Sequence, residues 1–266
     1  MSGPEGAVSM RELAGSLMSS ELLKYAFQYG GFLLEAAVIM HVVRSGNFRR
    51  LAGPMVYVAC ILGVGTSRAY VIHHFGLKSS EYGYFYWTSD AALVLAAFAV
   101  VCVLFYRASA HEEKIWSFVR VTLVAVFLGV LAFSINSLLS HKDQLFTGFI
   151  VEFSQNVYFA CLVLITLLYI LMQQLGNTDD ELGFLVCGMG IQFAGPAASL
   201  ALFHLTSGEQ MVRSLIGFII PVCTLAMLVI WLYALKRQPQ TAVDASLARG
   251  LVAWPEPAGD LKLRLR

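Results

Sequence analysis

The chain has 266 residues, of which 58% are hydrophobic and 13% charged, and its net charge is +1. A soluble domain carries about 25% charged residues, so a globule this apolar would lack the polar groups to cover its surface. The nearly balanced charge, without a basic stripe interleaved with aromatic residues, argues against a nucleic-acid partner. The expected surroundings of the chain are therefore a lipid bilayer.

The first twenty residues lack the continuous apolar core of a cleavable signal peptide. Pro4, Glu5, Arg11 and Glu12 interrupt them. We expect residues 1–20 to form an extracytoplasmic segment. The first span, which follows directly, is then expected to serve as an uncleaved insertion signal.

Seven stretches of the chain are long and apolar enough to cross the hydrocarbon core, which takes about 20 residues of helix. Helices are required because lipid offers backbone groups no hydrogen-bond partner. The runs are too long and too uniformly apolar for the strands of a β-barrel. The predicted fold is therefore all-α, a polytopic membrane bundle of seven transmembrane helices in one domain over 21–236. The expected spans are 22–43, 51–73, 83–106, 115–139, 145–172, 182–205 and 211–235.

Lys and Arg near the span ends predict the orientation, because cytoplasmic loops carry more of both. The cluster between Arg44 and Arg50, in a very short loop, contributes most. The pattern predicts a multi-pass cell-membrane protein with its N-terminus outside and its C-terminus in the cytoplasm. Residues 237–266 are expected to be a disordered cytoplasmic tail or a weak anchor on anionic lipid. The predicted cytoplasmic side carries seven of these residues: Arg44, Arg49, Arg50, Arg107, Lys114, Lys236 and Arg237. The predicted outer side carries five: Arg11, Lys24, Lys78, Lys142 and Arg213.

Three charged residues inside the expected spans lie at a similar depth. Arg68 lies in the outer third of the second span, and Asp90 and Glu152 lie near the outer ends of the third and fifth. At about 1.5 Å of helix rise per residue, all three fall within roughly 10 Å of the outer surface. An unpaired charge at this depth costs several kcal/mol, so we expect the three side chains to meet inside the bundle.

Two interpretations of this cluster remain open. In the first, an internal salt bridge fixes the register of the helices. In the second, an outward-facing polar cavity binds a ligand or passes a proton, since the single Arg68 cannot neutralise two acids. Asn156, one turn after Glu152 on the same helix face, belongs to the cluster. Glu35, deeper in the first span, is a further intramembrane acid and a candidate of the same kind.

The third span opens with the aromatic residues Tyr82, Tyr84, Phe85, Tyr86 and Trp87. Tyr and Trp rings partition to the membrane interface, so an aromatic belt is one interpretation. Alternatively, the rings that face inward line the ligand site, and Tyr86 is the candidate for this role. Ring orientation decides between the two.

No cofactor or metal site is predicted. His73, His74, His141 and His204 fall at the outer ends of three spans, without HxH or HExxH spacing, so a metal site would require those ends to be adjacent. The five cysteines form no CxxC pair and are expected to pack as small hydrophobes. No catalytic constellation appears, which makes an enzyme the least favoured class.

Residues 44–107 resemble a pattern of uncharacterised bacterial seven-transmembrane-helix proteins. In that pattern a basic loop precedes the second span, as Phe-Arg-Arg does at 48–50. An aromatic start of the third span, here Tyr-Phe-Tyr-Trp at 84–87, leads to an acidic residue, here Asp90. The resemblance implies a bacterial seven-span topology. It implies no chemistry, because the family has no assigned activity.

Three roles fit these features. A receptor or sensor module would bind a small molecule in the outer cavity and act through a membrane-protein partner, because the chain has no output domain. A structural or accessory subunit of a membrane complex would have Arg68 fully paired and no cavity. A small proton-coupled transporter would use the same carboxylates, and symmetry between the first three and last three spans would favour it.

Overall fold

The computed structural model describes residues 10–45, 48–76, 79–109, 113–140, 145–175, 179–205 and 210–237. Within these ranges the chain is all-α and contains no strand, which confirms the all-α part of the predicted fold class. Each of the seven predicted spans lies inside one helix. The helices are α1 (Met10–Ser45), α2 (Phe48–Phe75), α3 (Ser80–Ser109), α4 (Glu113–Ser140), α5 (Leu145–Gln174), α6 (Asp180–Leu205) and α7 (Gln210–Lys236).

Six of the described helices, α2 to α7, are long and apolar enough to cross a membrane, as expected of a multi-pass membrane protein. The first helix, α1, is not among them, and Glu35, His41 and Arg44 make it more polar than the others. It also begins at Met10, so part of the predicted extracytoplasmic segment is helical. The predicted tail beyond residue 237 lies outside the described residues.

Polar and glycine residues mark the ends of several helices. The Oγ of Ser79, just before α3, accepts a hydrogen bond from Tyr82 N at 3.1 Å, and the Asp179 carboxylate plays the same part at the start of α6. Each satisfies an amide that lacks a partner within its helix. After α2, Gly76 has a φ of 81°, and its N–H donates to Ile72 O at 2.9 Å. This left-handed residue ends the helix without strain.

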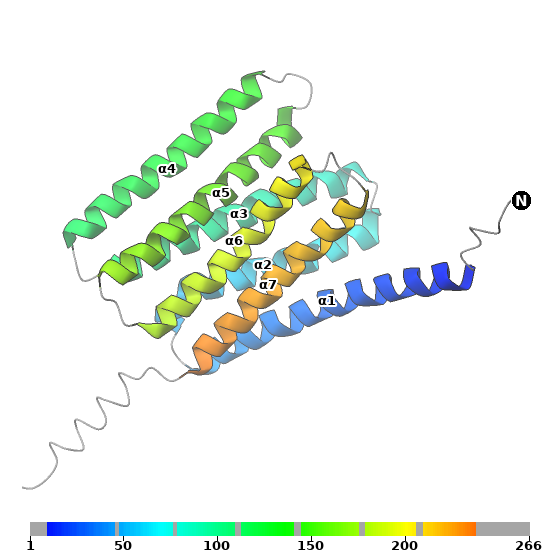
Figure 1. Cartoon of the computed structure of the whole chain (residues 1–266), viewed down its shortest axis with the longest axis horizontal. Coiled ribbons are helices and arrows are strands. Elements are labelled where there is room, and N and C mark those ends of the chain that lie inside the picture. The colour runs from blue at the N-terminus through cyan, green and yellow to red at the C-terminus, as the bar shows by residue number, and fades with distance from the viewer. Residues whose placement is uncertain are drawn as a thin grey trace, which may run out of the picture.

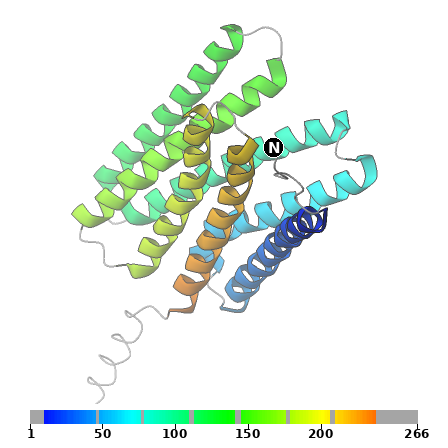
Figure 2. The ribbon, with the colours of Figure 1, turned by 45° about the vertical axis from the view of Figure 1, so that its right-hand side comes forward.

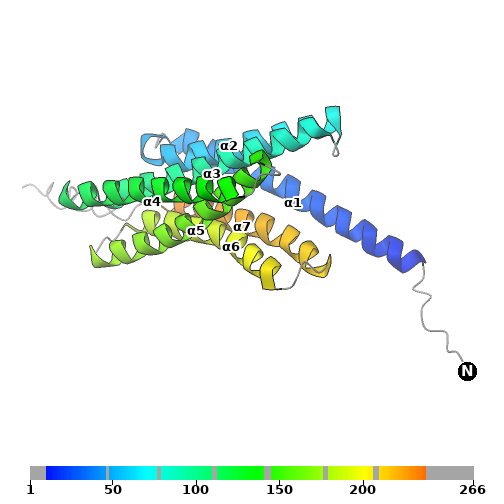
Figure 3. The same ribbon diagram turned by 90° about the horizontal axis from the view of Figure 1, so that it is seen from above.

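Successive helices run antiparallel and form one bundle (Figure 1). At one edge α4 packs against α5, and at the other edge α1 packs against α2 and α7. In Figure 2, α7 lies between α6 and α1. We call the side where α2 ends and α3 begins the Arg68 end, and the side where α3 ends and α6 begins the Arg107 end. Towards its N-terminus α1 leaves the bundle, as Figure 3 shows.

The helices α6 and α7 approach closely because glycines of α6 leave room for side chains of α7. A Cβ added to Gly188 would lie 2.6 Å from the Trp231 indole Nε1. The same Nε1 donates a hydrogen bond to Leu185 O at 3.1 Å. In the same way, a Cβ on Gly195 would lie 2.8 Å from Cys223 Sγ. These contacts fix α7, whose other side faces α1 and α2.

The helix α4 turns an apolar face away from the bundle. Phe118 is 74% exposed, and Val121, Leu128 and Phe133 on the same helix are exposed as well. In water, such a surface would mark an interaction site or an aggregation hazard. In a multi-pass membrane protein it is the surface that contacts lipid.

Candidate functional site

Arg68 of α2 is held by α3 at the Arg68 end. Its Nε donates a hydrogen bond to Ser89 Oγ at 2.8 Å, and its Nη2 donates to Tyr86 O at 3.0 Å. The Nη2 atom also lies 3.6 Å from Asp90 Oδ1. The side chains of the ion pair are only 20% and 25% exposed, so solvent screens the charges weakly. The predicted site residues Arg68, Asp90 and Tyr86 therefore lie together.

The aromatic residues at the start of α3 point in different directions. The Tyr86 ring turns inward, and its centroid lies 4.2 Å from Arg68 Cζ, which is a cation–π contact. Tyr84, two positions earlier, is 64% exposed, and Tyr70 of α2 is 63% exposed. Exposed rings at this level suit an interfacial belt. Tyr86 differs from them because it packs on the guanidinium.

A cavity of about 730 Å³ lies between α1, α2 and α7. Towards the Arg68 end it is lined by Arg68 and by Phe27 and Phe218, whose ring centroids are 6.2 Å apart in an edge-to-face contact. Towards its other end it is lined by Glu35 and Thr224. Most of the remaining lining is apolar, so the cavity combines an apolar wall with a few polar groups.

Glu35 is the buried acid of this cavity. Only 5% of its surface is exposed, and its Oε2 has no hydrogen-bond partner among the described residues. No described residue forms an ion pair with it. A buried polar atom without a partner is unusual and calls for an explanation, such as a bound ligand, ion or water. Although Glu35 lies deeper than Arg68 in the sequence pattern, both residues line the same cavity.

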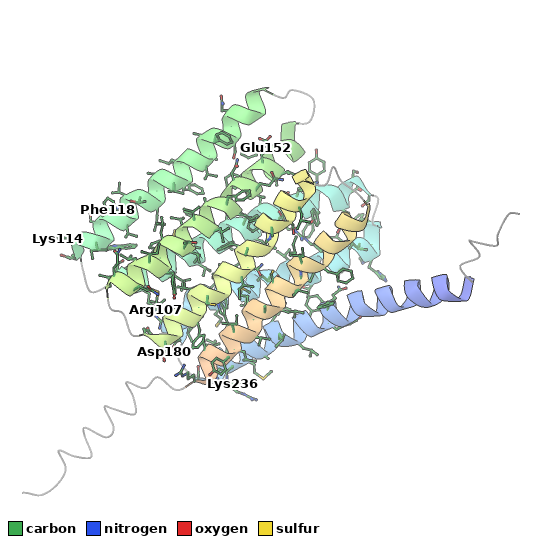
Figure 4. The ribbon with its side chains drawn as sticks, in the orientation of Figure 1. Arg107, Lys114, Phe118, Glu152, Asp180 and Lys236 are labelled. Carbon is green, nitrogen blue, oxygen red and sulfur yellow. The ribbon has the colours of Figure 1, made fainter. Side chains whose placement is uncertain are left out.

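The two predicted site residues of α5 lie on another face. Asn156 Nδ2 donates to Ser134 Oγ of α4 at 3.2 Å, and Ser134 is fully buried. Glu152 lies one turn earlier, near the start of α5 (Figure 4). Within the described residues it pairs with neither Arg68 nor Asp90. The structure thus brings Arg68 and Asp90 together and leaves Glu152 and Asn156 apart from them.

Ser154 was not among the predicted site residues, yet it lies beside the Asp90 carboxylate. Two helical positions are about 200° apart around the axis, so Ser154 faces α3 whereas Glu152 does not. Its buried Oγ makes no hydrogen bond to a described residue. A spacing signal exists, because Ser154, Tyr158 and Cys161 form a stripe at i, i+4 and i+7 on α5.

Gln192 of α6 was also not predicted. Its amide lies beside the buried phenol of Tyr57, and its Oε1 has no partner among the described residues. The signal was present in the sequence, since Gln192 is a polar residue in the middle of an apolar span. Together with Ser154 it shows that polar groups continue from the Asp90 carboxylate into the centre of the bundle.

The Arg107 end holds a second group of charges. Arg107 Nη2 lies 2.8 Å from Asp179 Oδ2, and its Nη1 lies 3.0 Å from Glu181 Oε1. Arg237, just after α7, lies 3.3 Å from Asp180, and its Cζ stands 5.9 Å from the Phe184 ring centroid. Figure 4 shows Arg107 and Asp180 at this end. The group ties the end of α3 and the end of α7 to the start of α6.

Among the residues that the structure describes, no group of three His, Cys, Asp or Glu side chains is placed to hold a metal ion. His73 and His74 lie side by side at the end of α2, with ring centroids 5.9 Å apart. The predicted candidate His141 lies outside the described ranges. Comparison with known proteins finds no family model, no curated protein and no solved structure that matches the chain.

Proposed function

We propose that the chain is a membrane receptor or sensor module that binds a small molecule in the cavity between α1, α2 and α7 and acts through partner proteins. The observation that carries the proposal is a buried Glu35 oxygen without a partner in a cavity of about 730 Å³. Small-molecule sites commonly enclose about 300–1,000 Å³, with apolar walls and a few polar groups that orient the ligand. This cavity has the same composition.

The proposal includes seven crossings of a bacterial membrane, with α1 as the first span. This helix has 36 residues, and a bilayer core of about 30 Å requires only about 20. Its buried acid, Glu35, faces the cavity rather than lipid, as intramembrane acids usually do. Arg44, Arg107, Lys114 and Arg237 gather at the Arg107 end, which supports a cytoplasmic location for that end.

Tags at the two termini test this topology. Protease or antibody added to intact cells should reach an N-terminal tag, whereas a C-terminal tag should be reached only after permeabilisation. Access to both tags from one side would contradict seven crossings. Retention of the untagged chain in an aqueous fraction without detergent would contradict the membrane location itself.

Ligand binding is tested by a variant that fills the cavity. Gly31 lines it, and an added Cβ there meets nothing within 4 Å, so the side chain of Gly31→Leu starts in open space and takes up part of the cavity. Gly30→Leu is the matched control, because Gly30 is equally open but does not line the cavity. We expect a compound library to contain a molecule that raises the unfolding temperature of the wild type and of Gly30→Leu but not of Gly31→Leu.

If no compound distinguishes Gly31→Leu from the control, the receptor proposal fails. The second candidate is then a structural or accessory subunit of a membrane complex. One observation favours it, namely that Ser89, Tyr86 and Asp90 already engage the Arg68 guanidinium. Movement of a binding compound across proteoliposomes, driven by a proton gradient, would instead identify a transporter.

A further inference from the structure

The polar groups of the cavity differ in what they offer a ligand. Glu35 Oε2 is an acceptor without a described partner. The Thr224 hydroxyl donates its hydrogen to Ile220 O at 3.1 Å, so its oxygen remains available as an acceptor. Both residues line the same part of the cavity. This part of the cavity therefore suits a ligand group that donates hydrogen bonds and accepts none.

The charged donor of the cavity is already engaged. The Arg68 guanidinium donates to Ser89 and to Tyr86 O, and it is balanced by Asp90. An anionic ligand would have to compete with these contacts. By contrast, the Glu35 carboxyl has no described cation beside it. When the Glu35 carboxyl is ionised, the uncompensated charge of the cavity is negative, and a cation complements it.

The shape of the cavity adds an apolar requirement. On α1 its lining runs from Phe27 to Glu35, which is about 12 Å at the rise of a helix. Phe27, Phe32 and Phe218 supply aromatic walls. Phe32 lies one turn before Glu35 on the same helix, so its ring is placed to contact a cation bound at the carboxylate.

An entrance from the bilayer follows from the path of α1. Towards its N-terminus this helix leaves the bundle (Figure 3), and the cavity begins on it at Phe27. A molecule dissolved in the outer part of the membrane would enter the cavity laterally, from the bilayer. An ordinary acyl chain could enter by this route too, but it would leave the Glu35 oxygen without a partner.

We infer that the cavity takes an amphiphile with a protonated amine on an apolar body. The ammonium group, which has three donors and no acceptor, binds Glu35 and Thr224. The apolar body lies along Phe27, Phe32 and Phe218. This inference rests on the proposed function and specifies the chemical class of its ligand.

Three ten-carbon probes test the inference: decylamine, decanol and decanoate, which share an apolar body and differ in the head group. Radiolabelled probe is bound to the full chain in phosphatidylcholine nanodiscs, and binding to empty nanodiscs is subtracted. We expect saturable binding of decylamine, about tenfold tighter than that of decanol, because a hydrogen bond between charged groups contributes more than a neutral one. Decanoate should show no saturable binding.

Four variants locate the site. Glu35→Gln should weaken decylamine binding about tenfold, to the level of decanol, because the charge-assisted bond is lost. Gly31→Leu should abolish it. Gly30→Leu and Glu81→Gln should bind like the wild type, since Gly30 does not line the cavity and Glu81 is an exposed acid at the start of α3. Loss of binding in Glu81→Gln would indicate surface attraction and overturn the inference.

Other outcomes separate the inference from the proposed function. Equal binding of decylamine and decanol, or tighter binding of decanoate, overturns the amine assignment. If that binding still disappears in Gly31→Leu, the proposed function stands. Absence of Gly31-dependent binding for all three probes overturns the inference, and the library screen then decides the proposed function separately.

Discussion

The charged residues at the two ends of the bundle are paired to different degrees. At the Arg107 end, both Asp179 and Glu181 reach the guanidinium, at 2.8 Å and 3.0 Å. At the Arg68 end, Asp90 lies 3.6 Å from the guanidinium, whereas Glu35 lines the same cavity as Arg68 and forms no ion pair with a described residue. At the Arg107 end both acids thus form ion pairs with the arginine, whereas of the two acids near Arg68 only Asp90 does.

The difference suggests how to separate structural charges from functional ones in this protein. Charges that satisfy each other connect helices, as Arg107 connects α3 to the start of α6. A charge left without a partner beside a cavity destabilises the chain unless something binds it. Substitutions at the Arg107 end should therefore reduce stability strongly. A substitution of Glu35 should instead reduce ligand binding and change stability little.

The largest effect on stability is expected from Arg107→Met. The change removes the guanidinium that pairs with the Asp179 and Glu181 carboxylates and should lower the free energy of unfolding by about 2–4 kcal/mol. The value is below that of a fully buried pair, because Asp179 is 30% exposed. Denaturant unfolding of the purified chain in detergent measures it.

Arg44→Met is the matched control, because Arg44 is an exposed arginine at the end of α1 without an ion pair to a described residue. Its change in unfolding free energy should stay within about 0.5 kcal/mol. Equal losses in the Arg107 and Arg44 variants would show that the ion pairs do not hold the Arg107 end together.

Arg68→Met should have a smaller effect, about 1–3 kcal/mol, because the ion pair with Asp90 is longer. The double variant Arg68→Met with Asp90→Asn should be more stable than Arg68→Met alone, since it removes the unpaired carboxylate. Unfolding of both single variants and the double variant completes a double-mutant cycle. A coupling energy near zero would contradict a stabilising contact between the two side chains.

Ser134→Ala should lower the free energy of unfolding by about 1 kcal/mol, which is typical of one hydrogen bond between neutral side chains. The change removes the partner of Asn156 and weakens the contact between α4 and α5. Glu152→Gln, on the same face of α5, should change the unfolding free energy by less than about 0.5 kcal/mol. A larger loss for Glu152→Gln would give that acid a structural role that the described contacts do not show.

The smallest effect on stability is expected from Glu35→Gln. Because no described partner is lost, the free energy of unfolding should stay within about 0.5 kcal/mol of the wild type or rise. The same variant should lose amine binding. Loss of folded protein in this variant would contradict the difference between the two ends, since Glu35 would then stabilise the bundle as Arg107 does.

Part of the candidate site was predictable from the sequence, because charged residues inside apolar spans are visible without a structure. Arg68, Asp90 and Glu35 stand out in this way. The serines beside them do not, since Ser89 and Ser154 are small polar residues of the kind that also pack in ordinary helix contacts. Equal depth was a poor guide to contact for Glu152, because depth fixes the height of a residue and not the direction in which it points.

By itself, the sequence predicted contact with a lipid bilayer and where the seven helices lie, because apolar length and polar connections are local properties. Only the tertiary structure decided which polar groups meet. The rotation of each helix about its axis depends on packing with neighbours that are distant in the chain, such as Gly188 against Trp231. This packing placed Glu35 and Arg68 in one cavity and turned Glu152 away from it.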